Sequence, residues 1–245
     1  MRLPLLAALI IAAAPAYASA AELPKGDCAA PAPMTDLRHC AFAGAMLMGK
    51  DLHGADLRGV KLARARMNGC NLAGARLDGA NLRWTNMEGC NLADATFRKG
   101  DMLHVNLTST RLKGADFSGA FMFGAILSQA VGKDASFAGA HLRDVEMDTA
   151  RLPGADFSSA MLFRGFVIGS TLRGARFDKA NMTGLSIEES DLSEATFHGA
   201  NMAGANLVNV KLKGADFSGA NLENITLEDS ETAGARGLPA SLAKK

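Results

Sequence analysis

A-D-F-S-G at residues 115–119 returns twenty residues later as A-S-F-A-G at 135–139, and once more as A-D-F-S-S at 155–159. The phenylalanine of this unit recurs at the same interval over most of the chain, at Phe97, Phe117, Phe137, Phe157, Phe177, Phe197 and Phe217. A fixed period of this length predicts a solenoid, in which one structural unit of twenty residues stacks on the next.

A shorter period of five runs inside this unit. Every fifth residue from Leu37 to Leu227 is Leu, Phe, Met, Val or Ile, with the single exception of Gly132. Neither a helix nor a strand keeps this spacing on one side, because a helix has 3.6 residues per turn and a strand alternates its faces. A coil that turns a corner every five residues does, and four sides complete one coil. Two positions before each large residue the side chain is mostly small, which suits a narrow, close-packed interior.

Units such as A-D-L-R-G at 55–59 and A-N-L at 80–82 resemble the A-(D/N)-(L/F)-x-x pattern of the pentapeptide repeat family. The resemblance extends over residues 35–229 of the 245. It implies an all-β fold, a right-handed quadrilateral β-helix of about ten coils in a single domain.

The two ends of the chain depart from the repeat. Arg2, a short apolar stretch and the small residues Ala18-Ser19-Ala20 are typical of a secretory signal peptide, which predicts cleavage after Ala20. The expected location is therefore the periplasm or the cell exterior, with no transmembrane segment after cleavage. The expected divisions are a signal peptide at 1–20, an N-terminal leader and cap at 21–34, the repeat array at 35–229 and a C-terminal cap and tail at 230–245.

Removal of residues 1–20 leaves 25 Lys and Arg against 25 Asp and Glu. A neutral chain lacks the basic excess that general nucleic-acid binding requires, so no nucleic-acid partner is expected. Some pentapeptide repeat proteins protect DNA gyrase as acidic mimics of DNA. The neutral charge and expected export of this chain argue against that role.

The four cysteines form two candidate pairs. Cys28 and Cys40 lie outside or at the edge of the repeats, where a disulfide would tie the N-terminal segment onto the first coil. Cys70 and Cys90 are twenty residues apart at the small inward position, so they stack on successive coils. That separation permits a disulfide, although parallel inward side chains favour two buried thiols. No His or acidic residue joins them, so no metal site is expected.

The outer faces and the ends are the places left for function, because the interior has no room for a ligand. Outward positions around the middle coils are unusually apolar, at Trp84, Leu103, Phe121, Phe123, Ile126, Met161, Phe163, Phe166 and Ile168. A contiguous exposed patch predicts an interface with a protein partner or a second copy. Two alternatives stay open: a locally irregular coil near Gly132 that turns these residues inward, and scattered apolar residues without a role.

A second face is basic, with Arg111, Lys113, Lys133, Arg151, Arg173, Lys211 and Lys213 interrupted by Asp134, Asp191 and Glu194. Such a face suits anionic lipid, envelope polysaccharide or an acidic partner. An ordinary solvated face of a neutral protein is the alternative.

No catalytic, cofactor-binding or metal-binding pattern is found among the Ser, His, Gly and acidic residues. A convex rod also lacks the concavity that an enzyme needs, so neither catalysis nor a small-molecule substrate is expected. The sequence predicts a non-catalytic exported binding or scaffolding rod that acts through protein–protein contacts on its outer faces. The alternative is a structural or stress-related envelope component without a specific partner, and a DNA-mimic regulator of a DNA enzyme is less favoured.

Overall fold

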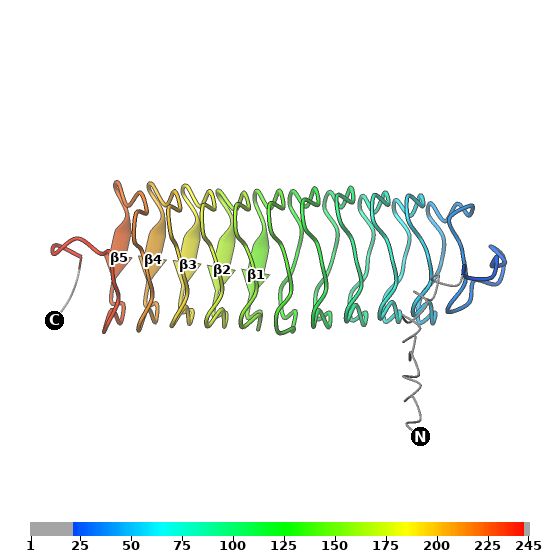
Figure 1. Cartoon of the computed structure of the whole chain (residues 1–245), viewed down its shortest axis with the longest axis horizontal. Coiled ribbons are helices and arrows are strands. Elements are labelled where there is room, and N and C mark those ends of the chain that lie inside the picture. Colours follow the sequence, from blue (N-terminus) through cyan, green and yellow to red (C-terminus); the bar gives the residue numbers. More distant parts are fainter. Residues whose placement is uncertain (1–21, 243–245) are drawn as a thin grey trace, which may run out of the picture.

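The computed structural model describes residues 22–242, which form one long parallel β-solenoid (Figure 1). Isolated β-bridges pair residues twenty apart, and one such ladder runs from Asp36 to Arg236. Backbone hydrogen bonds join each coil to the next, as where the Leu57 amide donates to the Arg76 carbonyl oxygen at 2.7 Å. The constant offset of twenty residues confirms the stacked coils expected from the repeat.

The longer strands lie along one side of the C-terminal half (Figure 1). They are β1 (Glu146–Asp148), β2 (Phe166–Ile168), β3 (Ser186–Glu188), β4 (Asn206–Val208) and β5 (Thr226–Glu228). They form a parallel sheet in the order β1-β2-β3-β4-β5, in which Met147 pairs with Val167 and Val167 with Ile187. Among residues 22–242 there is no helix that could span a membrane.

The solenoid has four faces, which we number by their inward residues. Face 1 carries the phenylalanine column from Phe97 to Phe217. The other three faces carry, in the middle coils, Met102, Met122 and Leu142 (face 2), Leu107, Leu127 and Met147 (face 3), and Leu92, Leu112 and Leu152 (face 4). These inward side chains are all fully buried, and β1 to β5 belong to face 3.

The seven phenylalanines of face 1 form one continuous stack. Adjacent ring centroids lie between 4.6 and 5.2 Å apart, and adjacent ring planes are within 6° of parallel. Isolated aromatic pairs prefer offset or edge-to-face arrangements. The parallel stack therefore follows from the backbone, because its spacing matches the roughly 4.8 Å between neighbouring strands.

Gly132 takes the place of an inward residue on face 4. A Cβ atom on Gly132 would lie 2.5 Å from the carbonyl carbon of Leu112, so the backbone itself closes the space that a large side chain fills elsewhere. The coil keeps its register, since Val131 pairs with both Arg111 and Arg151. The irregularity is therefore local and does not turn the outer residues of neighbouring faces inward.

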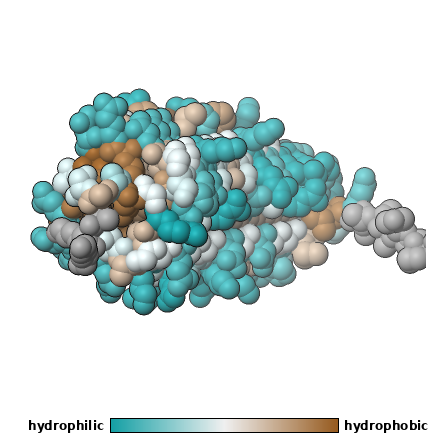
Figure 2. All heavy atoms as spheres, turned by 60° about the vertical axis from the view of Figure 1, so that its left-hand side comes forward, coloured by the Kyte–Doolittle hydropathy of each residue, from teal (hydrophilic) through white to brown (hydrophobic). Residues whose placement is uncertain are grey.

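The paired array extends beyond residue 229, because Lys211 pairs with Glu231 and Asp216 with Arg236. In the last coil Leu222, Ile225 and Leu227 are only partly buried. Figure 2, in which the C-terminal end comes forward, shows hydrophobic atoms gathered there. The predicted signal peptide at 1–20 lies outside the described residues.

Both cysteine pairs come together in the structure. The Cα atoms of Cys28 and Cys40 are 5.5 Å apart and those of Cys70 and Cys90 4.6 Å apart, and each pair is joined as a disulfide. The second pair differs from the two thiols that the sequence favours. Both sulfur atoms of the second pair lie in the buried interior, where successive coils stack one cysteine over the other.

Candidate functional site

The outer surface of face 2 is hollowed near its corner with face 1, in a concavity of about 590 Å³. Its apolar lining consists of Leu103, Phe121, Phe123, Met161 and Phe163. Its polar lining consists mainly of Arg83, Lys99, Asp101, His141 and Arg143. The volume falls in the range of ligand-binding sites, which are mostly apolar with a few placed polar groups.

Two neighbouring ladders build this concavity. In the first, Phe121 pairs with His141 and His141 with Met161 on successive coils. The second ladder lies two residues further along each coil, and contains Phe123, Arg143 and Phe163. Side chains two residues apart on a strand point to the same side. The repeat therefore places residues from distant parts of the sequence on one outer surface.

The guanidinium of Arg143 lies between two phenyl rings. Its central carbon is 5.4 Å from the ring centroid of Phe123 and 5.1 Å from that of Phe163, both within cation–π range. Its Nε atom is buried without a hydrogen bond, and lies 3.4 Å from a carboxylate oxygen of Asp144. The two rings therefore flank the cation on either side within the apolar lining.

The charges around the concavity are unequal. Three cations, Arg83, Lys99 and Arg143, line it together with one carboxylate, Asp101. Asp101 already pairs with Arg83, at 3.1 Å. Lys99 has no ion pair among the residues that the structure describes. The concavity is therefore apolar at its walls and positively charged.

A row of aromatic side chains leads from Trp84 to this site. The Trp84 indole stacks on the His104 ring at 4.1 Å between centroids, and His104 meets the edge of Phe123 at 5.3 Å. Trp84 is 53% exposed. It lies at the end of the row as the one tryptophan of the chain, so its fluorescence can report on the site.

The apolar patch expected from the sequence is divided by the structure. Leu103, Phe121, Phe123, Met161 and Phe163 line the concavity, and Trp84 joins it through His104. Ile126, Phe166 and Ile168 lie on face 3, where Glu146 separates Ile126 from Phe166 in the ladder and Asp148 pairs with Ile168. The residues on face 3 are therefore interrupted by carboxylates, and only the residues on face 2 form a hollow.

The predicted basic residues share face 4. One ladder contains Arg111, Arg151 and Lys211, in a run that also includes Val131, Thr171 and Asp191. The second, two residues further along each coil, contains Lys113, Lys133, Arg173 and Lys213. Arg173 pairs with Glu194 at 2.6 Å, and Lys133 lies 3.8 Å from Asp134. The basic charge of this face is thus partly neutralised by its own acidic residues.

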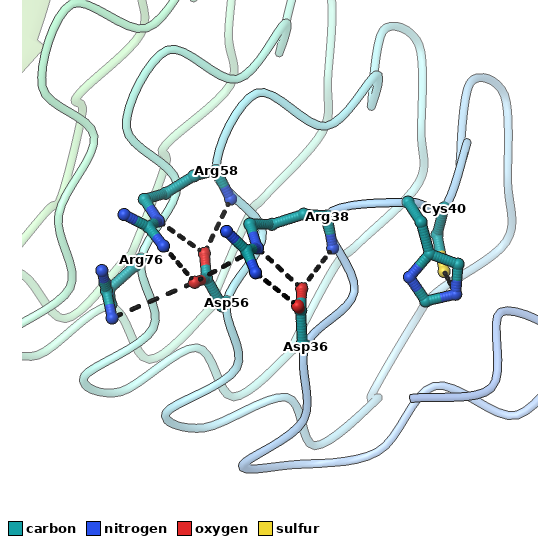
Figure 3. Close-up of polar contacts among 7 residues, drawn as sticks. Asp36, Arg38, Cys40, Asp56, Arg58 and Arg76 are labelled. Carbon is teal, nitrogen blue, oxygen red and sulfur yellow. Dashed lines mark hydrogen bonds and ion pairs between the residues drawn. The ribbon is translucent and has the colours of Figure 1, made fainter. Parts of the chain in front are cut away.

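Face 1 carries a network of ion pairs near its N-terminal end (Figure 3). Asp56, which is only 4% exposed, binds Arg58 at 2.6 Å and lies 3.6 Å from Arg38 and 3.9 Å from Arg76. Burial alone would raise the pKa of Asp56, but hydrogen bonds from Arg58 outweigh it and lower that pKa. Because these charges are paired with one another, the network indicates a stabilising role.

One group of donor atoms near this network has the composition of a metal site. Cys28, His39 and Cys40 have ligand atoms within 4.8 Å of one another. The two sulfur atoms are bonded to each other in the structure, which leaves the imidazole as the remaining donor. A thiolate is the form of cysteine that binds metal. The cluster therefore does not support metal binding while the disulfide is intact.

His198, on face 1, bridges two carboxylates of neighbouring coils. Its Nδ1 atom is 3.0 Å from Asp178 and its Nε2 atom 3.2 Å from Asp216. The contact with Asp216, followed by that with Asp178, raises the pKa of His198 above its ordinary value of 6.5. Hydrogen bonds from Ser218, with His198 and Arg236 nearby, lower the pKa of Asp216 to about 2.

Replacing His198 with glutamine should destabilise the protein in acid and not in alkali. A raised folded-state pKa means that the stabilisation is complete below about 6.5 and is lost as the pH rises through that raised value. Urea midpoints of the two proteins, compared at pH 5 and pH 9, measure this. An equal difference at both pH values would show that the charge of His198 does not contribute.

Comparison with known proteins identifies a matching family and several similar solved structures. The family model described as "Pentapeptide repeats" matches eight copies, over residues 35–62, 51–89, 90–129, 133–164 and 190–229. No curated protein matches the sequence. A similar solved structure is HetL, a pentapeptide repeat protein involved in heterocyst differentiation regulation from the cyanobacterium Nostoc sp. strain PCC 7120. It is 28% identical with a TM-score of 0.47, and the match covers 82% of this chain and 88% of that one.

Two further structures are also similar. QnrB1, a plasmid-mediated fluoroquinolone resistance protein, is 22% identical with a TM-score of 0.42, over 76% of this chain and 85% of that one. A pentapeptide repeat protein of the Arabidopsis thaliana thylakoid lumen is 27% identical with a TM-score of 0.26, over 42% of this chain and 69% of that one.

Proposed function

Because this chain belongs to the pentapeptide repeat family and the interior of its described coils is filled with buried apolar side chains, we propose that it is a non-catalytic binding rod that holds a protein partner on face 2. The observation that carries this proposal is the concavity lined by Phe121, Phe123 and Phe163. Phe121 is 50% exposed and Met161 42%, although both could be polar without disturbing the repeat. Clustered exposed aromatic side chains beside an arginine are typical of the centres of protein interfaces.

The rigidity of the rod supports binding at this site. The coils are joined by backbone hydrogen bonds on every face, and the Arg143 guanidinium is held between two rings. A surface that is already ordered loses little conformational entropy when a partner binds. Burial of the apolar side chains then contributes to affinity without being offset by a large loss of conformational entropy.

The proposed location is the periplasm or the cell exterior. Residues 1–20 have the composition of a signal peptide, and Cys28 and Cys40 lie at a separation that suits a disulfide. Appearance of a chain shortened by 20 residues in a periplasmic fraction would support this location. A full-length cytoplasmic protein would contradict it.

A photo-crosslinking residue at position 163, in living cells, tests the binding function. We expect it to form an adduct with a defined partner protein, because Phe163 lines the concavity. The same residue at position 201 is the control, since Asn201 lies exposed on the same face in a later coil. Equal adducts at both positions, or none from a folded protein at position 163, would instead favour a structural envelope component without a specific partner.

Replacing Phe121 with aspartate should strongly reduce the yield of the adduct at position 163. A carboxylate in the apolar lining must be desolvated when the partner binds, so we expect a loss of about tenfold or more in adduct yield. Phe166→Asp is a matched control, because Phe166 is 51% exposed against 50% for Phe121 but lies on face 3. Thermal unfolding by circular dichroism should change little in either variant. If both substitutions reduce the adduct equally, face 2 is not the specific contact.

A further inference from the structure

We propose that the partner segment carries an acidic side chain beside an apolar one, and that face 2 recognises both together. This inference rests on the proposed function and specifies the partner of the same site. The apolar side chain would pack over the ladder that contains Phe121, His141 and Met161, and the carboxylate would pair with Arg143. The occupant is thus an acidic, apolar segment of a protein.

The first argument is the charge of the concavity. Asp101, its one carboxylate, is already paired with Arg83, whereas Lys99 has no ion pair among residues 22–242. A purely apolar segment that covered this surface would remove Lys99 from water without a compensating charge, and would leave Arg143 with Asp144, a carboxylate that Arg164 shares. Burying an unpaired charge is costly, so an occupant that brings a carboxylate is favoured over a neutral one.

The second argument is the position of Arg143. Its guanidinium lies between the Phe123 and Phe163 rings, and these contacts reduce the side-chain entropy that is lost when a carboxylate binds. Among residues 22–242 its ion-pair partner is Asp144, at 3.4 Å from Nε, and Asp144 also pairs with Arg164 at 3.3 Å. A guanidinium carries five N–H donors in a planar fork that matches a carboxylate. The arginine therefore retains donors for an incoming acid.

The third argument is the spacing of the two ladders. Phe121 and Met161 belong to one, and Arg143 belongs to the other, two residues further along each coil. Two strand residues span about 7 Å, which is comparable to the separation of nearby side chains in an extended peptide. A short extended segment can therefore reach the apolar ladder with one side chain and Arg143 with another.

Two short peptides test the inference. The first is the tripeptide aspartate-leucine-phenylalanine, blocked at both ends by acetyl and amide groups, and the second has asparagine in place of aspartate. Binding is followed by the fluorescence of Trp84, which contacts the site through His104 and Phe123. We expect the acidic peptide to bind about tenfold tighter or more, as a charge-assisted hydrogen bond provides.

The variant Arg143→Met separates recognition of charge from recognition of apolar surface. Methionine keeps an apolar chain between the two rings and removes the cation, so the preference for the acidic peptide should vanish while the asparagine peptide still binds. Arg164→Met is the control, because Arg164 also pairs with Asp144 but does not line the concavity. It should leave the preference unchanged.

Several outcomes would overturn the inference. Equal binding of the two peptides by the unmodified protein would mean that the site binds apolar side chains and does not recognise charge. An unchanged preference for the acidic peptide in Arg143→Met would mean that Arg143 is not the residue that recognises the carboxylate. No binding of either peptide would also overturn it, and the crosslinking at position 163 then decides separately whether the proposed function stands. Displacement of the acidic peptide by phosphatidylglycerol vesicles, lost in Arg143→Met, would assign the site to a membrane surface instead.

Discussion

Replacement of Phe157 by alanine is expected to lower the free energy of unfolding by about 3–5 kcal/mol, the range found when large buried side chains are truncated. Phe157 is fully buried, with the rings of Phe137 and Phe177 at 4.9 and 5.0 Å on either side. Its neighbours cannot move together to fill the gap, because backbone hydrogen bonds fix the distance between coils. Urea unfolding monitored by circular dichroism measures the loss.

Two further substitutions are controls for Phe157→Ala. Phe217 ends the stack, so it has one neighbouring ring, Phe197, and lies under a last coil whose inward residues are only partly buried. Phe217→Ala should therefore cost less, because an end coil can relax. Phe121→Ala, on the surface, should change stability by about 0.5 kcal/mol or less. If Phe157→Ala costs no more than Phe121→Ala, the phenylalanine stack does not stabilise the solenoid.

The fold was predictable because the repeat leaves the chain few choices. A large apolar residue at every fifth position can be buried only if the chain turns a corner after each, and the column of phenylalanines fixes four corners per coil. The structure confirms this stacking. Gly132 was less predictable, because a missing side chain permits either an underfilled layer or a shifted backbone. Which of the two occurs depends on how closely the Leu112 backbone approaches Gly132, and the period of the sequence does not predict that distance.

The candidate site was predictable only in part. The register of the repeat identifies Phe121, Phe123 and Phe163 as outward residues, and an outward aromatic residue already departs from the pattern. The register of the repeat does not predict the concavity on face 2, where the long Arg143 side chain lies between two phenyl rings. Side-chain conformations of this kind arise from packing between coils. The pairing of Asp56 with Arg58 was missed for the same reason, although acidic and basic residues alternate there in the sequence.

Replacing both Cys28 and Cys40 with serine is expected to loosen the N-terminal end of the rod by about 3 kcal/mol, the entropic value for a loop of about this length. The two residues are 12 apart in sequence, and their bond holds the leader against the first coil. The amides of Leu37, Phe42 and Leu47 donate to carbonyl oxygens of the second coil, so they are protected while the first coil stays folded.

Hydrogen exchange of those three amides measures the loosening, and should become about a hundredfold faster in the double variant, as the free-energy change implies. The amide of Leu127 is the control, because it donates to Glu146 in the middle of the array and is separated from the leader by several coils. In a solenoid each coil contacts only its neighbours, so a change at one end should not reach the centre. Faster exchange at Leu127 as well would mean that the rod unfolds as a single cooperative unit. Unchanged exchange at Leu37 would mean that packing, rather than the disulfide, holds the N-terminal end.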